Sequence, residues 1–513
     1  MSQAVLDHPR LKVHRPASRA FPASRQTLAI CCLLALTALV RLPGVGRPLL
    51  GVYATKNVAH AMIARNWAEG TASIWYPTLD CLGRGGRMLH LNEFPASAAL
   101  TAGLWKALGG SLDVWGRLTS IALSVGSVGL MFLLVRRWHG PAAAWGSSVV
   151  LALSPVSVIY GQGFMLEPSI VFLTLATVAS LDHWLGERRW WQLAAAGTCF
   201  GLLVLTKFYM LVLLAPLGAM VFQRHAHGER RDGCHAHACR GHAIRAALIL
   251  VLALLPAAAW YAMAWTASAP DGEFAGRIHC SVRQSADAHR PPHPLLFKPD
   301  FYRSVLDNLA GVTLTPLGLG LVLVGLLDFA WRKHAVWLAS MGLVGAALPL
   351  KFHESNYYYL VILPPLCILA GLGWKLLHER LRPRRTAIAG LLALGLVFSL
   401  RHAAGPAFAT PAEDRHVVAA AAAIRELTNS DEPVVTMHGS TIDLLYYCQR
   451  TGWAVTPDHP ELSKTLTECA RQGARYLVVT PWPSTASAAP FSPSLADLDT
   501  IHIGDGFRIL RLR

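Results

Sequence analysis

Two carboxylates and one lysine lie beside long apolar segments, where a charged side chain is costly unless it is paired or used. Glu93 lies in "HLNEFPASAAL", Glu167 lies in "GQGFMLEPSI", and Lys207 in "VLTKFYM" has apolar residues on both sides. A positioned carboxylate can accept a proton, and a buried lysine can hold an anion such as a phosphate. These residues are therefore candidate functional residues. The structural alternative is solvated loop acids and a lysine that reaches the membrane surface.

The composition is that of a membrane protein. Of the 513 residues, 53% are hydrophobic and only 15% are charged, whereas about a quarter of the residues in a soluble domain are charged. The net charge of +16 is concentrated in short segments such as "VRRWHG" and "KLLHERLRPRRTA", while "PLKFHESNYYY" carries little of it. This alternation is the positive-inside pattern. The charge therefore reports orientation, and binding to nucleic acid is not needed to explain it.

Apolar runs predict a polytopic α-helical membrane protein with about eleven transmembrane helices, because each run approaches the ~20 residues that cross a bilayer. Residues 1–26 would form a basic cytoplasmic N-terminus. Residues 27–402 would form the transmembrane domain, with long external loops at 44–116 and 266–308. An odd number of spans puts the C-terminus outside the cell. The predicted spans are 27–43, 117–135, 141–159, 168–185, 190–206, 208–223, 244–265, 309–330, 335–350, 356–374 and 386–402.

After Arg401 the pattern changes to short helices and strands that alternate along the chain. Such alternation predicts that residues 403–513 form a small external α/β domain with a mostly parallel sheet. The region contains no G-x-G-x-x-G motif, so no nucleotide site is expected in it. A disulfide between Cys448 and Cys469 is allowed on the external side.

Histidines and cysteines crowd one predicted cytoplasmic loop, "RHAHGERRDGCHAHACRGH", at residues 224–242. Such side chains can bind zinc or nickel. Their spacing matches no structural zinc site, and the sequence therefore predicts no metal site there.

In their order along the chain, several segments resemble the GT-C glycosyltransferases, specifically glycosyltransferase family 39. This family comprises protein mannosyltransferases and lipid A aminoarabinose transferases. The resemblance implies an enzyme that moves a sugar from a polyprenyl-phosphate donor to a lipid, glycan or protein acceptor at the outer face of the membrane. No cofactor is implied as a requirement, although a divalent metal occurs in some members. The segments are "NEFPASAALTAGLWKALGG", "ALSPVSVIYGQGFMLEPSIVFL", "GLLVLTKFYMLVLLAPL" and "HESNYYYLVILPPLCILAGLGW".

The resemblance also assigns roles to individual residues. Glu167 and Glu93 would orient or deprotonate the acceptor as catalytic carboxylates. Lys207, His353 and Tyr358 would bind the donor phosphate.

The stretch "YATKNVAHAMIARNW" is expected to be an amphipathic helix on the membrane surface that forms one wall of the cavity. Lys56 and Arg65 would assist in binding the anionic head group of the donor. Family members carry an acid in this first loop, and here its position falls at Lys56 or Asn57, neither of which can serve as a carboxylate base. Either another group replaces the acid, or the protein is no longer a transferase. The candidate replacements are Glu93, Glu167, Asp80, His60 and His90.

Three functions are therefore compared. The first is a membrane glycosyltransferase of the cell inner membrane, multi-pass, with a cytoplasmic N-terminus and a periplasmic C-terminal domain. The second is a non-catalytic scaffold that keeps the pocket for a lipid phosphate. The third is a secondary transporter, which the absence of a visible inverted repeat disfavours. The sugar and the acceptor are not specified by the sequence.

Overall fold

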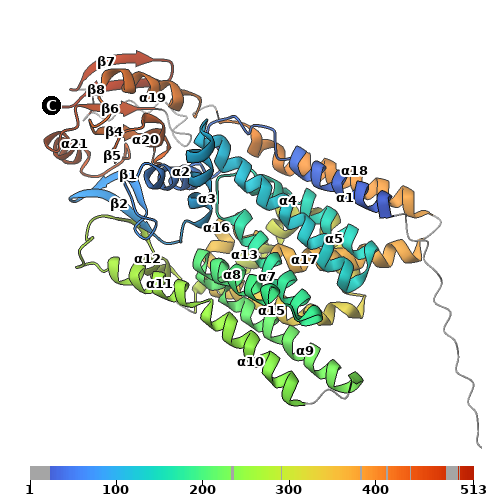
Figure 1. Ribbon diagram of the computed structural model, residues 1–513. Coiled ribbons are helices and arrows are strands. Elements are labelled where there is room, and N and C mark those ends of the chain that lie inside the picture. Colours follow the sequence, from blue (N-terminus) through green and yellow to red (C-terminus); the bar gives the residue numbers. More distant parts are fainter. Residues whose placement is uncertain are drawn as a thin grey trace, which may run out of the picture.

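This computed structural model describes residues 23–232, 236–289, 292–381, 384–411, 414–439, 441–480, 495 and 497–513. These residues form a bundle of helices and a mixed sheet packed at one end of it, which we call the sheet end (Figure 1). Residues 1–22 of the predicted N-terminal segment 1–26, and residues 233–235 of the 224–242 loop, lie outside the described residues.

The bundle contains most of the helices in the chain. Three 3-10 turns, η1 (Phe208–Leu213), η4 (Phe329–His334) and η5 (Asn356–Tyr358), and one π turn, η3 (Leu309–Thr313), interrupt it. Its helices are α1 (Ala23–Leu39), α4 (Leu112–His139), α5 (Pro141–Leu153), α6 (Pro155–Gly161), α7 (Glu167–Glu187), α8 (Trp190–Thr206), α9 (Leu214–Asp232), α10 (Ala236–Leu252), α11 (Leu255–Ala267), α13 (Pro299–Asn308), α14 (Thr315–Gly325), α15 (Ala335–Ala347), α16 (Pro349–Glu354), α17 (Tyr359–Arg380) and α18 (Arg385–Ala404).

The prediction of a polytopic helical membrane protein is confirmed. In the described part of the chain, five helices are long and apolar enough to cross a membrane, or seven if each of two bent pairs is one span. The pair α5–α6 bends by 55°, where Pro155 begins α6, and the pair formed by 299–313 and α14 bends by 106°. The eleven predicted segments fall largely on helical residues, but several of them are short. The number eleven therefore stays a prediction.

Small residues let the central helix α17 pack closely against its neighbours. A Cβ atom at Gly371 would lie 2.0 Å from the Ser147 hydroxyl oxygen, and a Cβ atom at Gly373 would lie 2.0 Å from the Leu321 carbonyl oxygen. Helices in membranes associate largely through such close packing, because lipid supplies no hydrophobic drive between them. The glycines of "LAGLGW" therefore fix α17 between α5 and α14.

The sheet has eight strands in the order β3-β2-β1-β5-β4-β6-β8-β7, and it draws on distant parts of the chain. Parallel pairs join β1 to β5, β4 to β5, β4 to β6 and β2 to β3, while the other pairs are antiparallel. The strands are β1 (Thr78–Gly83), β2 (Gly86–Leu91), β3 (Ile278–Ser281), β4 (Val434–Met437), β5 (Gly452–Ala454), β6 (Tyr476–Val479), β7 (Asp499–Gly504) and β8 (Phe507–Arg511).

The predicted C-terminal α/β region is confirmed as a mixed sheet with helices. Its strands β5, β4 and β6 run parallel, and β8 and β7 add an antiparallel edge. The sequence did not predict that β1, β2 and β3, from the two long loops, extend the same sheet. This joint sheet fixes the loops to the C-terminal region.

The helices at the sheet end are α2 (Ala54–Ala68), α3 (Ala96–Leu108), α12 (Val282–Ala288), α19 (Arg415–Leu427), α20 (Asp443–Cys448) and α21 (Leu462–Arg471). The short turns are η2 (Pro294–Phe297) and η7 (Gly405–Phe408).

Two sequence-based expectations need correction here. Helix α2 is not an amphipathic surface helix, because most of its residues are buried and it packs against α3, β1 and α20. Cys448 and Cys469 are free thiols, and they belong to two different apolar clusters of the C-terminal region.

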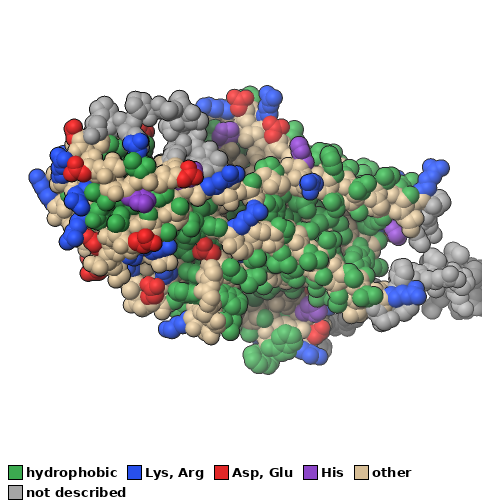
Figure 2. All heavy atoms as spheres, turned by 90° about the horizontal axis from the view of Figure 1, so that it is seen from above, with side chains coloured by type: hydrophobic (Ala, Val, Ile, Leu, Met, Phe, Trp, Pro, Cys, Tyr) green, Lys and Arg blue, Asp and Glu red, His purple; other side chains and the backbone are tan. Residues whose placement is uncertain are grey.

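Charge is segregated along the molecule. Figure 2 shows hydrophobic side chains over a broad middle region, while acidic and basic side chains gather mainly at the sheet end. A belt of apolar surface between polar ends is what a protein that crosses a bilayer requires.

Candidate functional site

A cavity of about 480 Å³ opens at the sheet end, where helices of the bundle meet the sheet. Residues that are far apart in the sequence line it, from both long loops, from the segment before α17 and from the C-terminal region. Its polar and aromatic lining includes Tyr53, Lys56 and His60 (around α2), His90, Asn92 and Glu93 (β2 and after), His279 and Cys280 (β3), Lys351, Tyr357 and Tyr358 (before α17), and Asp414, Thr441 and Asp443 (before α19 and α20).

Glu93 places one carboxylate at the wall of this cavity. Its Oε1 atom is paired with the ammonium group of Lys207, and both side chains are buried. Lys207 reaches this position because α8 ends at Thr206 and the chain becomes extended before η1. The other oxygen, Oε2, is buried and has no hydrogen-bond partner among the described residues. An unpaired buried carboxylate oxygen is costly, so this atom is ready to accept a hydrogen bond from a ligand.

Lys56 and Asn57 are the two residues at which the resemblance predicts the position of the first-loop acid. The Nζ atom of Lys56 lies 2.5 Å from Oε1 of Glu167 and 4.0 Å from the centre of the Tyr357 ring. Burial is the largest single effect on the pKa of Lys56 and lowers it, but Glu167 together with Tyr357 and Tyr358 outweighs burial, so the net pKa lies above its usual value. Lys56 therefore stays charged at the wall of the cavity, and Glu167 is buried behind it. Asn57 instead donates to the carbonyl oxygens of Val52 and Tyr53.

The two histidines that could replace the missing acid are weak bases here. Burial and the charge of Lys56 lower the pKa of His60 to about 3. Burial and the nearby His279 ring lower the pKa of His90 well below its usual value. Because the efficiency of a general base falls as its pKa falls, neither imidazole suits that role at neutral pH.

Tyr358 lines the cavity, and its ring lies 5.5 Å from the Lys207 ammonium group. His353 lies on α16 and is exposed, outside the cavity lining. The structure thus brings together Lys56, Glu93 and Tyr358 at the wall and Glu167 and Lys207 just behind it. Of the predicted donor-binding residues, it separates His353 and Arg65 from this group.

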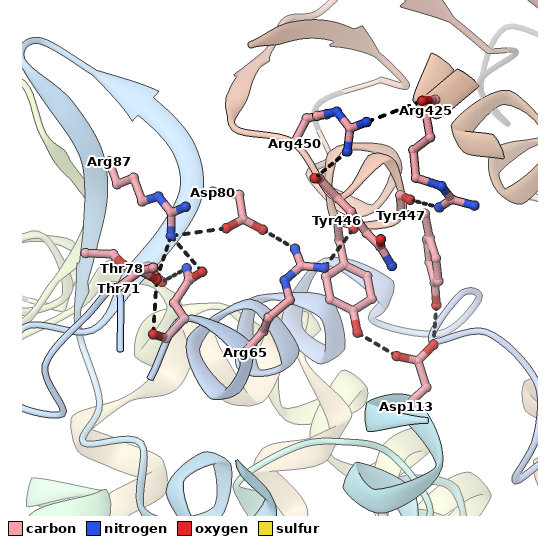
Figure 3. Close-up of polar contacts among 12 residues, drawn as sticks. Arg65, Thr71, Thr78, Asp80, Arg87, Asp113, Arg425, Tyr446, Tyr447 and Arg450 are labelled. Carbon is pink, nitrogen blue, oxygen red and sulfur yellow. Dashed lines mark hydrogen bonds and ion pairs between the residues drawn. The ribbon is translucent and has the colours of Figure 1, made fainter. Parts of the chain in front are cut away.

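Arg65 instead binds the sheet to α2. It forms an ion pair with Asp80 on β1, and its guanidinium group stacks 4.8 Å from the Tyr446 ring of α20 (Figure 3). Arg87 on β2 lies 3.8 Å from the same carboxylate and donates to the Asn66 side chain at 2.7 Å. Asp80 is therefore neutralised by two arginines, which removes it from the candidates for a catalytic base.

Asp113, at the start of α4, links the bundle to the C-terminal region. Its two carboxylate oxygens accept hydrogen bonds from the hydroxyl groups of Tyr446 (2.6 Å) and Tyr447 (2.8 Å), as Figure 3 shows. Arg425 in turn donates to the Tyr447 carbonyl oxygen. These contacts join α4 to α20, whose first residue, Asp443, lines the cavity.

Sequence reasoning missed several lining residues. Lys351 lines the cavity, and it is the one basic residue besides His353 in "PLKFHESNYYY". Its isolation in a segment otherwise poor in positive charge is a signal that could have identified it as a site residue. Asp414 and Asp443 carry no such signal, because only the folded C-terminal region brings them to the cavity. They lie 3.4 and 3.9 Å from the Nε2 atom of His438.

Among the residues that the structure describes, two groups of side chains could each hold a metal ion. His90, His279 and Cys280 form one group, and Asp414, His438 and Asp443 form the other, with the ligand atoms of each group within 4.8 Å of one another. Imidazole and thiolate are donors that zinc accepts. A role for a divalent metal stays a prediction.

Comparisons with known proteins address the family and the fold. Residues 91–267 match the model of the dolichyl-phosphate-mannose-protein mannosyltransferase family, while no curated protein sequence matches the chain. The fold is similar to that of ArnT from Cupriavidus metallidurans bound to undecaprenyl phosphate, with a TM-score of 0.60 at 14% identity over 96% of this chain and 98% of that one. The archaeal oligosaccharyltransferase AglB from Archaeoglobus fulgidus, in complex with an inhibitory peptide and a dolichol-phosphate, gives a TM-score of 0.54 at 14% identity over 89% and 70%.

The matched segment contains Glu93, Glu167 and Lys207, so the central part of the site lies within the family match. The ArnT comparison extends the likeness in fold to the sheet end. The resemblance predicted from the sequence is thereby confirmed at this level: this is a multi-pass membrane protein with an ArnT-like fold, and its residues 91–267 match the family of the protein mannosyltransferases.

Proposed function

We propose that this protein transfers a sugar from a polyprenyl-phosphate donor to an acceptor at the membrane face that bears the sheet. The observation that carries the proposal is the Oε2 atom of Glu93, a buried and unpartnered carboxylate oxygen on a cavity that also presents Lys56 and Lys351. A base and cations on one cavity are the two requirements of a transfer that expels a phosphate.

In the proposed reaction, an O–H or N–H group of the acceptor attacks the anomeric carbon of the sugar. The bond between that carbon and the phosphate oxygen breaks, and its electron pair leaves with the polyprenyl phosphate. Glu93 accepts the acceptor's proton. Lys56 and Lys351 stabilise the phosphate, while Glu167 keeps Lys56 protonated and in place. In this scheme the loss of the first-loop acid is offset by Glu93.

The test is transfer of radiolabelled sugar from polyprenyl-phosphate sugars in native membranes, comparing the wild type with Glu93→Gln. We expect transfer to fall about a hundredfold or more while binding of undecaprenyl phosphate is retained, which also reports that the variant is folded. Glu354→Gln is the matched control, because Glu354 is exposed and lies outside the cavity lining. Equal transfer by Glu93→Gln and the control would overturn the assignment of the base.

A second candidate is a scaffold that binds the lipid phosphate without turnover. It is favoured by one observation, the buried ion pair of Lys56 with Glu167, at one of the two positions where the resemblance predicts an acid. It predicts saturable binding of undecaprenyl phosphate by a wild-type protein that transfers no sugar from any donor in the panel.

The proposal includes an orientation. With the eleven spans expected from the sequence, the N-terminus is cytoplasmic and the sheet faces the periplasm of a cell with an inner membrane. The donor then approaches from the outer leaflet, where the cavity opens at the sheet end. The sugar and the acceptor are to be identified by the transfer assay.

A further inference from the structure

A second cavity, of about 600 Å³, lies at the opposite end of the bundle from the sheet. Helix α4 connects the two ends, because it begins beside the Asp113 contacts and ends at His139, which lines this cavity. Its 28 residues rise about 42 Å at ~1.5 Å per residue, enough to cross a membrane. The cavity is lined by residues of α4, α7, α9, η4 and α15, and it therefore faces the other leaflet.

Positive charge dominates the mouth of this cavity. Arg224 and Lys333 line it with exposed side chains. Among its described lining residues the one acid is Asp182, which already pairs with Arg137 at 2.7 Å and accepts a hydrogen bond from Trp138 at 3.0 Å. Neither Arg224 nor Lys333 forms an ion pair with a residue that the structure describes, so both cations at the mouth are available to an anion.

Two imidazoles close the polar side of the cavity. The Nε2 atoms of His139 and His334 lie 2.7 Å apart, so one of them must donate a proton to the other. This contact ties the end of α4 to η4, next to Lys333, and it holds the polar wall in place.

The facing wall is apolar. Pro216, Ala219 and Met220 on α9 line it together with Val336 on α15. A free phosphate would leave this surface unused, whereas a lipid with a charged head group would cover both walls. Basic pockets between transmembrane helices are known binding places for anionic lipid head groups.

We propose that this cavity binds an anionic phospholipid from the leaflet remote from the sheet. The phosphate group contacts Arg224 and Lys333, and an acyl chain lies along Pro216, Ala219 and Met220. The site is separate from the proposed transfer site and does not depend on it.

The test is native mass spectrometry of the full chain in detergent, with phosphatidylglycerol and phosphatidylcholine of the same acyl chains as probes. We expect the wild type to retain phosphatidylglycerol in preference to phosphatidylcholine. The double variant Arg224→Gln/Lys333→Gln should bind phosphatidylglycerol roughly ten- to thirtyfold more weakly, because each basic residue near the head group contributes about 1 kcal/mol to binding. The matched control is Arg136→Gln/Arg332→Gln, which removes the same charge from exposed residues outside the lining.

A further variant, Ala219→Trp, fills the apolar wall and leaves the charge unchanged, and we expect it to reduce retention as well. Equal retention of the two lipids by the wild type would overturn the proposal. So would an equal loss in the control pair, which would indicate binding to positive charge in general, or full retention in Ala219→Trp.

Discussion

At the scale of single residues, the site is built from two buried pairs of opposite charge. Lys56 pairs with Glu167, and Lys207 pairs with Glu93. Each carboxylate uses one oxygen in its pair and keeps the other buried and without a partner among the described residues. In each pair the two opposite charges compensate each other, which is why charged side chains are tolerated in this buried place. Removing one member would leave the other charge uncompensated.

Removal of Lys56 is therefore expected to destabilise the protein through Glu167. In Lys56→Met the buried carboxylate loses its cation, and we expect the free energy of unfolding to fall by about 3–5 kcal/mol. The double variant Lys56→Met/Glu167→Gln should recover much of this stability, because neither charge remains. Thermal unfolding in detergent measures both variants, and a double variant as unstable as the single one would contradict the pairing.

At the residue scale, the sequence pointed to the three isolated charges at the centre of the candidate site. Glu93, Glu167 and Lys207 stand out as isolated charges in apolar surroundings, and the structure brings all three together. Pairing between them could not be read from the sequence, because each partner comes from a different element. Arg65 shows the limit of such reasoning, since its partner Asp80 looks like an ordinary loop acid until β1 is placed beside α2.

At the scale of elements, α2 is the part that joins the cavity to the sheet. One side of it carries Lys56 and His60 to the cavity, and its other end carries Arg65 and Asn66 to β1 and β2. The sequence suggested a surface helix because polar residues recur along it. Their actual partners are strands from the same loop and α20 from the C-terminal region, which are not adjacent in sequence.

Arg65 is therefore expected to matter for stability and not for donor affinity. Arg65→Met should lower the free energy of unfolding by about 3–5 kcal/mol, because Asp80 then loses its closer cation. Arg84→Met, which removes an exposed charge on the β1–β2 turn, is the matched control. A changed affinity for undecaprenyl phosphate in Arg65→Met, at unchanged stability, would argue for the donor-binding role instead.

Close packing of α17 gives a second expectation at this scale. In Gly373→Ala the new Cβ atom would lie 2.0 Å from the Leu321 carbonyl oxygen, so α14 and α17 must separate. We expect the free energy of unfolding to fall by about 1–3 kcal/mol, the usual cost of overpacking, or by more. Gly390→Ala, on the exposed helix α18 with no atom within 4 Å, should be neutral. Equal melting temperatures for the two variants would show that α17 is not held by this contact.

At the scale of the whole molecule, two regions are joined by one sheet and by the contacts of Asp113. Composition and charge patterning predicted the membrane class and the C-terminal α/β region, because both depend on properties summed over many residues. The joint sheet could not be predicted, because β1 pairs with β5 at only one pair of residues, Cys81 and Gly452. So short a pairing leaves no recognisable pattern in the sequence of either strand.

Orientation is the property of the whole chain that is easiest to test. An alkaline phosphatase reporter placed after Arg513 should be active in the periplasm, and the same reporter placed in the 224–242 loop should be inactive, because the positive-inside pattern keeps that loop in the cytoplasm. The reverse result would mean that the whole chain has the opposite orientation, and equal activity at both places would mean an even number of spans between the loop and the C-terminus; either outcome would contradict the predicted topology.

The central claim is that the cavity bounded by Lys56 and Glu93 receives the polyprenyl phosphate. The most direct measurement is the structure, by electron cryomicroscopy in nanodiscs, of the protein saturated with undecaprenyl phosphate. The account predicts the phosphate in hydrogen-bond contact with Lys56 or Lys351, on the side of the cavity that Glu93 faces. Density for the lipid only at the Arg224–Lys333 cavity, or none in the cavity at the sheet end, would contradict it.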